Sequence, residues 1–176
     1  MFSPSMTKEL TRYVRTLTFI WLAFLTAPII YGFIGWMIHG QRADAEPATL
    51  PPVVPAVLAV AGVLAAGALF LFSRASLERV VRGETPLTGL ATAPVSTPAG
   101  LQEHEAELLR RYPAFQTAMI LRWAGFESLT LLGLVAAVMG AGLQPLLIGA
   151  ALSVGLTFLA RPRLPEFLAA CRRSLR

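Results

Sequence analysis

The sequence has little charge, and four long stretches have none. Only 14% of its 176 residues are Asp, Glu, Lys or Arg, whereas 55% are hydrophobic, and the mean hydropathy is +0.62. A typical soluble domain carries about 25% charged residues. No charged residue occurs in residues 16–38, 53–72, 128–143 and 143–160. This shortage of charge excludes an ordinary soluble domain and indicates a membrane protein.

Each charge-free run is long enough, alone or with its flanks, to cross a bilayer. A hydrocarbon core about 30 Å thick needs roughly 20 helical residues to span it. We therefore expect an all-α integral membrane protein with four transmembrane helices. The expected spans are residues 16–38, 52–73, 114–140 and 143–160.

A secretory signal peptide is the alternative for the first apolar run, because residues 43–45, Ala-Asp-Ala, imitate a cleavage site after it. The run holds 23 residues without charge, which exceeds the roughly 7 to 15 residues of a signal-peptide core. We expect it to remain as a span. Cleavage would leave three spans.

Lysine and arginine gather on one side of the expected spans. Of the 15 such residues, 14 lie before the first span, between the second and third, near the start of the third, or after the fourth. Arg42 alone lies in the opposite loop. Because cytoplasmic loops are enriched in Lys and Arg, we expect both termini and the central loop in the cytoplasm. The expected location is the bacterial inner membrane.

This topology divides the chain into three parts. Residues 1–83 form a first transmembrane hairpin with a basic cytoplasmic extension, and residues 84–112 form a linker with a short helix. Residues 113–176 form a second hairpin with a basic amphipathic tail. A shift of 101 residues lays residues 22–34 on 123–135, which predicts that the hairpins are repeats. Chance likeness between apolar helices is the alternative.

Two basic amphipathic segments, residues 73–83 and 164–176, are expected at the cytoplasmic membrane surface, where they would contact anionic lipid headgroups. The net charge of +5 could also suit nucleic acid. No basic stretch carries the interleaved aromatics of a single-strand binding platform, so we predict no nucleic-acid partner. Cys171 is the only cysteine and is predicted to be a free thiol, with palmitoylation as the alternative.

Small residues line the second and fourth expected spans. They are Gly62, Ala66, Gly67, Gly149, Ser153 and Gly155. Small side chains let neighbouring membrane helices approach closely. We therefore expect these surfaces to pack helices in a homo-oligomer or a membrane-protein complex.

The sequence has no pattern that predicts catalysis. The spans hold no nucleophile with a base, no paired carboxylates and no phosphate-cradling glycine loop. Residues 103–107 combine three glutamates with one histidine, but a single imidazole on a solvated acidic helix is a poor metal site. No enzyme activity, cofactor or metal is predicted.

One carboxylate interrupts the third span. Glu127 lies 16 residues after Arg111, or about 24 Å along a helix, which is near mid-membrane. An ionised acid there costs about 3 kcal/mol, so the side chain should face protein or water and favour its protonated form. We predict a proton or cation site formed by Glu127, Ser128, Thr130 and, at the repeat-equivalent position, Thr26. Alternatively, Glu127 only joins helices in a membrane scaffold or assembly factor.

Residues 110–140 resemble the carboxylate-bearing helix of the proteolipid subunit c of rotary ATP synthases. Residues 111–113, Arg-Tyr-Pro, take the place of the family's Arg-x-Pro loop motif. Other residues stand at spacings like those of the family helix: Gln116, Thr117, Met119, Glu127 and Gly133. The resemblance implies that Glu127 carries an ion.

The chain also departs from that family. Arg122 and Trp123 replace small residues, the linker is longer than the family's tight polar loop, and span two lacks the glycine ladder. The resemblance covers about 30 residues, as the range 110–140 shows. A ring subunit, a distant relative and a convergent helix are the three interpretations that remain open.

Overall fold

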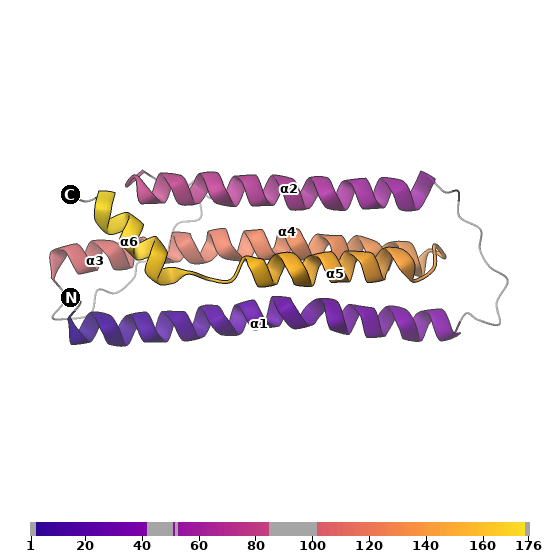
Figure 1. Ribbon diagram of the computed structural model, residues 1–176, viewed down its shortest axis with the longest axis horizontal. Coiled ribbons are helices and arrows are strands. Elements are labelled where there is room, and N and C mark those ends of the chain that lie inside the picture. The colour runs from indigo at the N-terminus through magenta and orange to yellow at the C-terminus, as the bar shows by residue number, and fades with distance from the viewer. Residues whose placement is uncertain (1–2, 42–50, 52, 85–101, 175–176) are drawn as a thin grey trace. The chain divides into compact units, whose positions relative to one another are not determined.

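The computed structural model describes residues 3–41, 51, 53–84 and 102–174. Of these residues, 89% are helical and none lies in a strand, which confirms the all-α prediction for the described part of the chain. Residues 43–45 and linker residues 85–101 lie outside the described residues. The helices (Figure 1) are α1 Pro4–Gln41, α2 Val53–Val81, α3 Glu103–Arg110, α4 Tyr112–Val138, α5 Gln144–Leu159 and α6 Leu164–Ser174.

Three helical segments are long and apolar enough to cross a membrane: α1, α2 and the combined α3 and α4, Glu103–Val138. In this last segment, the charged helix α3 precedes the apolar part. Helix α5 has 16 residues and is therefore about 24 Å long, shorter than a bilayer core of about 30 Å. It qualifies as a fourth span only together with α6, and this pair bends by 50°. The described chain thus has three to four candidate spans and is compatible with a membrane location.

Local sequence sets the ends of these helices. Ser3 caps α1, because its hydroxyl and carbonyl oxygens accept hydrogen bonds from the backbone N–H groups of Met6 and Thr7. Gly140 and Gly142 form the turn between α4 and α5 with φ angles of 105° and 77°. Only glycine adopts such angles without strain, so these two residues allow α5 to run back along α4.

The described helices divide into two compact units. The first unit comprises Met1–Ile20, Leu71–Leu121 and Pro162–Arg176, and the second comprises Trp21–Phe70 and Arg122–Arg161. Helices α1, α2 and α4 contribute residues to both units, whereas α3 and α6 belong to the first and α5 to the second. The charge-free runs fall mainly in the second unit.

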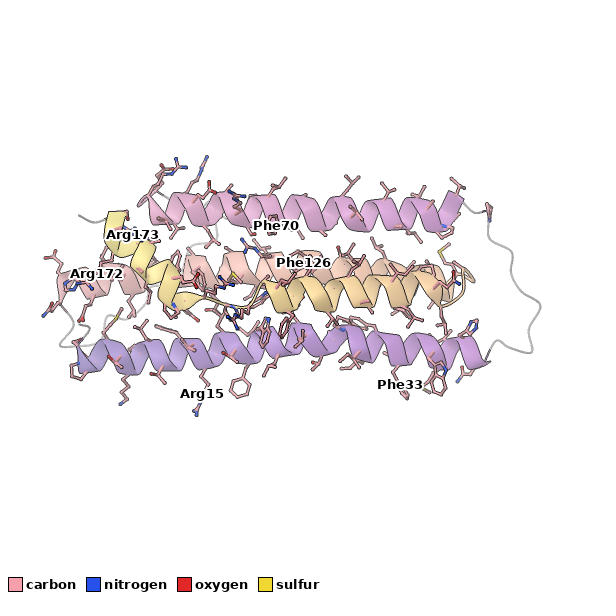
Figure 2. All side chains as sticks on the ribbon, in the orientation of Figure 1. Arg15, Phe33, Phe70, Phe126, Arg172 and Arg173 are labelled. Carbon is pink, nitrogen blue, oxygen red and sulfur yellow. The ribbon has the colours of Figure 1, made fainter. Side chains whose placement is uncertain are left out.

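In the second unit, glycines bring α2 and α5 close to α4. A Cβ added to Gly125 of α4 would lie 3.4 Å from the backbone of Ala66 on α2. A Cβ added to Gly133 would lie 2.6 Å from the carbonyl oxygen of Pro145 on α5. Larger apolar side chains face outward; Phe33 of α1 is 58% exposed and points away from the neighbouring helices (Figure 2). Such an apolar exterior suits lipid.

In the first unit, aromatic rings join α1, α4 and α6. Tyr13 of α1 stacks on Tyr112 of α4 with ring centroids 4.1 Å apart, and the Tyr112 hydroxyl donates a hydrogen bond to the Tyr13 carbonyl oxygen at 3.1 Å. Phe115 of α4 stacks on Phe167 of α6 at 4.5 Å. Tyr112, Phe115 and Phe167 are buried and belong to the core of this unit.

A buried carboxylate ties the start of α1 to α3. Glu105 is 1% exposed, and its oxygens accept hydrogen bonds from the backbone N–H and the hydroxyl of Ser3, both at 2.7 Å. The Gln102 N–H donates a third hydrogen bond at 3.3 Å and completes a capping box. The Ser3 N–H makes the largest contribution to a lowered pKa of Glu105, which outweighs the effect of burial.

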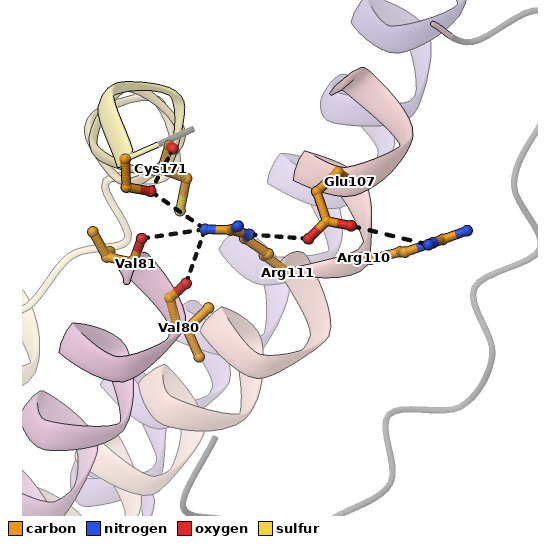
Figure 3. Close-up of polar contacts among 7 residues, drawn as sticks. Val80, Val81, Glu107, Arg110, Arg111 and Cys171 are labelled. Carbon is orange, nitrogen blue, oxygen red and sulfur yellow. Dashed lines mark hydrogen bonds and ion pairs between the residues drawn. The ribbon is translucent and has the colours of Figure 1, made fainter. Parts of the chain in front are cut away.

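Arg111 closes the C-terminal end of α2 (Figure 3). Its side chain is 10% exposed, and Nη1 donates hydrogen bonds to the carbonyl oxygens of Val80 and Val81 at 3.1 and 3.2 Å. Its Nε lies 3.4 Å from Glu107 Oε1. The Val80 carbonyl oxygen also accepts a hydrogen bond from the Gly83 N–H at 3.1 Å. Carbonyls in the last turn of a helix lack helical donors, and Arg111 supplies one for Val81. Cys171 is fully buried beside this group, and burial raises the pKa of its thiol.

Candidate functional site

Glu127 lies on α4 in the second unit, four residues after the buried Trp123. Its side chain is half-buried, and the hydroxyl of Tyr31 on α1 is hydrogen-bonded to it. A phenol donates and a carboxylate accepts, so this bond joins α1 to α4. The preceding residue, Phe126, stacks on Phe70 of α2 with ring centroids 6.3 Å apart (Figure 2). The carboxylate therefore lies beside the phenol of Tyr31.

The hydroxyls that the sequence groups with Glu127 donate their hydrogen bonds to other groups. Ser128 Oγ donates to a backbone carbonyl of α4 at 2.6 Å, and Thr130 Oγ1 donates to the Gly149 carbonyl of α5 at 3.4 Å. Thr26 is exposed and donates to carbonyls within α1. None of these hydrogen bonds involves the carboxylate.

The small residues predicted to pack helices fall into two groups. Four are buried: Gly62, Ala66, Gly149 and Ser153. A Cβ added to Gly149 would collide with the backbone carbonyl of Leu129, so α5 approaches α4 this closely only because the residue is glycine. Two are exposed, with no atom within 4 Å of an added Cβ: Gly67 and Gly155.

Two indoles join other helices to the C-terminal end of α5. Trp21 Nε1 of α1 donates a hydrogen bond to the Thr157 carbonyl oxygen at 2.9 Å. Trp123 Nε1 of α4 donates to the Ala160 carbonyl oxygen at 3.0 Å. The carbonyls at the end of a helix have no helical donors, so these indoles satisfy acceptors that lipid could not.

The buried face of α5 is small and polar. Its buried residues are Leu146, Gly149, Ser153 and Thr157, which recur every three or four positions. Ser153 is 0% and Thr157 is 1% exposed, and neither hydroxyl has a hydrogen-bond partner among the described protein groups. A buried polar group left without a partner costs about 1–3 kcal/mol.

Few charges surround Glu127. Besides Glu127, the titratable side chains among the described residues of the second unit are Tyr31, His39, Arg122 and Arg161. The Arg122 guanidinium lies 4.9 Å from the ring centroid of Phe70 on α2, a cation–π arrangement. Neither α5 nor the second-unit part of α2 holds a titratable side chain.

Tyr31 is the site residue that the sequence analysis misses. It is the only tyrosine in the four charge-free runs, and a phenol in an apolar run is a possible hydrogen-bond partner for a carboxylate. Its pairing with Glu127 was not visible, because that contact depends on the relative rotation of two helices that lie far apart in the chain.

The described residues contain no group of three or more His, Cys, Asp or Glu side chains that could hold a metal ion. No protein-family model, curated protein or solved structure matches this chain. The functional proposal therefore rests on the chemistry of the chain's own residues.

Proposed function

We propose that this protein is a multi-span membrane subunit in which Glu127 takes up and releases a proton. The observation that carries the proposal is a half-buried carboxylate, hydrogen-bonded to Tyr31, in a part of α4 that has no other charged residue between Arg122 and its end at Val138. An ionised carboxylate is costly at membrane depth, whereas its protonated form is tolerated. A modest change in hydration or in a neighbouring helix can therefore shift the carboxyl group between the two forms.

The contacts around Glu127 favour a proton over a larger cation. A cation that leaves water needs several oxygen ligands. The hydroxyls of Ser128, Thr130 and Thr26 keep lone pairs that could bind a cation, but their hydrogen bonds run to backbone carbonyls and none of those bonds gathers these oxygens around Glu127. The hydrogen bond to Glu127 comes from Tyr31. A proton needs only the carboxylate itself.

The proposal includes four spans in two repeated hairpins, with both termini in the cytoplasm of a bacterium. The distribution of Lys and Arg supports this orientation. The protein would act in a homo-oligomer or membrane complex, with its basic segments 73–83 and 164–176 at anionic lipid headgroups. The likeness of residues 110–140 to the carboxylate helix of ATP synthase subunit c supports a proton-carrying role for Glu127.

A hydrophobic carbodiimide tests this proposal, because it reacts with protonated carboxyls in apolar surroundings. In native membranes we expect Glu127 to be labelled and labelling to fall as pH rises. Glu107, a more exposed acid in the first unit, is the internal comparison and should remain unlabelled near neutral pH. Mass spectrometry of peptides locates the adduct. Absence of labelling at every pH would contradict the proposal, and protection by sodium would replace the proton with a cation.

Tyr31→Phe sharpens the test. The phenol stabilises the carboxylate as a hydrogen-bond donor, so its loss should favour the protonated form and move half-maximal labelling to higher pH. An unchanged midpoint would show that Tyr31 has no part in the protonation of Glu127.

A membrane scaffold or assembly factor is the second candidate. Two observations favour it: the bond between Tyr31 and Glu127 joins two helices, and the exposed Gly67 and Gly155 leave space for a partner helix. Glu127→Gln distinguishes the two functions, because an amide keeps hydrogen bonds but cannot exchange a proton. Full physiological activity of that variant would favour the scaffold.

A further inference from the structure

Two hydroxyls on the buried face of α5 have no role in the site described above. Ser153 and Thr157 lie one helical turn apart, both buried and both without a protein partner. Helix α1 lies beside them, because the Trp21 indole donates to the Thr157 carbonyl. Helix α4 lies beside them too, because the Thr130 hydroxyl donates to the Gly149 carbonyl, one turn from Ser153. The two hydroxyls therefore lie where α1, α4 and α5 meet.

A backbone acceptor is freed on the facing side of α1. Pro28 lies inside the helix and has no N–H, so the Phe24 carbonyl lacks its usual helical donor. Pro28 is fully buried, and the Phe24 carbonyl lies one turn earlier on the same face. Measured from Trp21 and Thr157, which are in contact, Phe24 lies about 4.5 Å along α1 and Ser153 about 6 Å along α5. The freed carbonyl of Phe24 therefore lies near the level of Ser153.

Glu127 lies at this same level on α4. The α4 residues that bond to α5 lie on either side of it: Trp123 before and Thr130 after. The carbonyls that they contact, those of Ala160 and Gly149, likewise lie on either side of Ser153. Around the helix axis, Glu127 is about 40° from Trp123 and about 60° from Thr130, so it borders the face that meets α5.

We propose that water binds between α1, α4 and α5, held by the hydroxyls of Ser153 and Thr157 and the carbonyl of Phe24, and exchanges protons with Glu127. Water both donates and accepts, and a buried water molecule typically makes about three hydrogen bonds. It can therefore satisfy two hydroxyls and a carbonyl together, whereas a cation offers the hydroxyl protons no acceptor.

The exchange step rests on the proton function proposed above, but the water site does not. In this step a hydronium proton forms the O–H bond of the Glu127 carboxyl and leaves neutral water. The reverse step breaks that bond and restores the carboxylate. The charged and titratable groups on the elements around this carboxyl are Tyr31 and His39 on α1 and Arg122 on α4, with Arg161 following α5. Neither α5 itself nor the second-unit part of α2 adds any.

Thr157→Val tests the water site, because valine replaces the hydroxyl with a methyl group of similar shape. In a dry core the change removes an unpaired polar group and should raise the melting temperature. In a hydrated core it removes hydrogen bonds to water, and we expect a fall of about 2–4 °C for each kcal/mol lost. A melting temperature equal to or above wild type overturns the water site.

Thr18→Val is the matched control. The Thr18 hydroxyl already donates to the Val14 carbonyl within α1. Its loss should therefore leave the melting temperature, and the rate of deuterium exchange at Glu127 described below, close to wild type. Ser153→Ala provides an independent variant at the water site and should lower the melting temperature as Thr157→Val does. Thr157→Ser keeps the hydroxyl and should retain more of the stability than Thr157→Val.

Infrared spectroscopy tests the exchange with Glu127. The carboxyl stretch of Glu127, identified by its loss in Glu127→Gln, shifts when its proton is replaced by deuterium. We expect deuterium to enter about tenfold more slowly in Thr157→Val than in wild type, which corresponds to a barrier higher by one hydrogen bond. An equal rate overturns the link between this water and Glu127. Absence of any carboxyl band in wild type would instead refute the proton function, while the melting temperatures still decide the water site.

Discussion

Two carboxylates of this chain lie in contrasting surroundings. Glu105 is buried and accepts hydrogen bonds from the backbone and side chain of Ser3 and from the Gln102 N–H. Glu127 is half-buried in an apolar unit and receives a hydrogen bond from Tyr31. Several donors fix the ionised form of the first carboxylate, which suits a structural role. The single donor at Glu127 is compatible with the proton exchange that we propose for it.

The pH dependence of stability follows from the lowered pKa of Glu105. Because the folded-state value lies below the unfolded one, the carboxylate contributes stability above the unfolded pKa and loses it as pH falls through the folded pKa. We expect Glu105→Gln to destabilise the protein by about 1–2 kcal/mol at neutral pH, and the difference from wild type to shrink below about pH 4. Thermal unfolding in detergent across this range provides the measurement.

Glu103→Gln is the control for that experiment. Glu103 lies on the same helical turn but is exposed, so its replacement should have little effect at any pH. A deficit of Glu105→Gln that stayed constant from neutral to acid pH would mean that shape, and not charge, holds α1 to α3.

At the scale of the helices, glycines separate contacts made within the chain from surfaces left open. At Gly149 an added Cβ would collide with the Leu129 carbonyl, and at Gly133 it would lie 2.6 Å from the Pro145 carbonyl oxygen. These backbone atoms cannot move aside as a flexible side chain can. At Gly155 an added Cβ would meet no atom. One residue type thus serves close packing at two positions and leaves an open surface at a third.

Alanine substitutions measure this difference. Gly149→Ala should destabilise the protein by about 1–3 kcal/mol, because overpacking forces α5 away from α4. Gly155→Ala should leave stability unchanged or raise it by up to about 1 kcal/mol, since alanine forms helix better than glycine. Unfolding in mixed detergent micelles compares the two variants with wild type. Equal stabilities for both would refute the close contact between α4 and α5.

At the scale of the whole molecule, the sequence predicts which segments are helical better than it predicts which helices contact one another. The charge-free runs predict apolar helices correctly, because a span must be both apolar and long. The helices extend beyond these runs: α1 begins at Pro4, where Ser3 caps it and bonds to Glu105. Glu127 stands out because a charge in an apolar run is costly. The contact between Glu127 and Tyr31 depends on how α1 and α4 are rotated about their axes relative to each other, and the local sequence does not determine that rotation.

The same limit applies to the four predicted spans. The described helices provide three candidate spans, and a fourth only if α5 and the bent α6 cross together. An even number of crossings puts both ends of the chain on one side of the membrane, whereas an odd number separates them. The side on which the C-terminal end lies therefore decides whether α5 crosses.

Single cysteines can locate each segment by their reaction with a membrane-impermeant maleimide. Cys171→Ala provides the background, because a buried methyl group leaves no unpaired hydroxyl at this fully buried position. In intact cells we expect Asp44→Cys to be labelled, and Ser5→Cys, Leu90→Cys and Ser174→Cys to be labelled only after permeabilisation, as the distribution of Lys and Arg requires. Labelling of Ser174→Cys from outside, with Ser5→Cys protected, would mean three crossings and would leave α5 unable to span. Labelling of Leu90→Cys from outside would overturn the orientation itself.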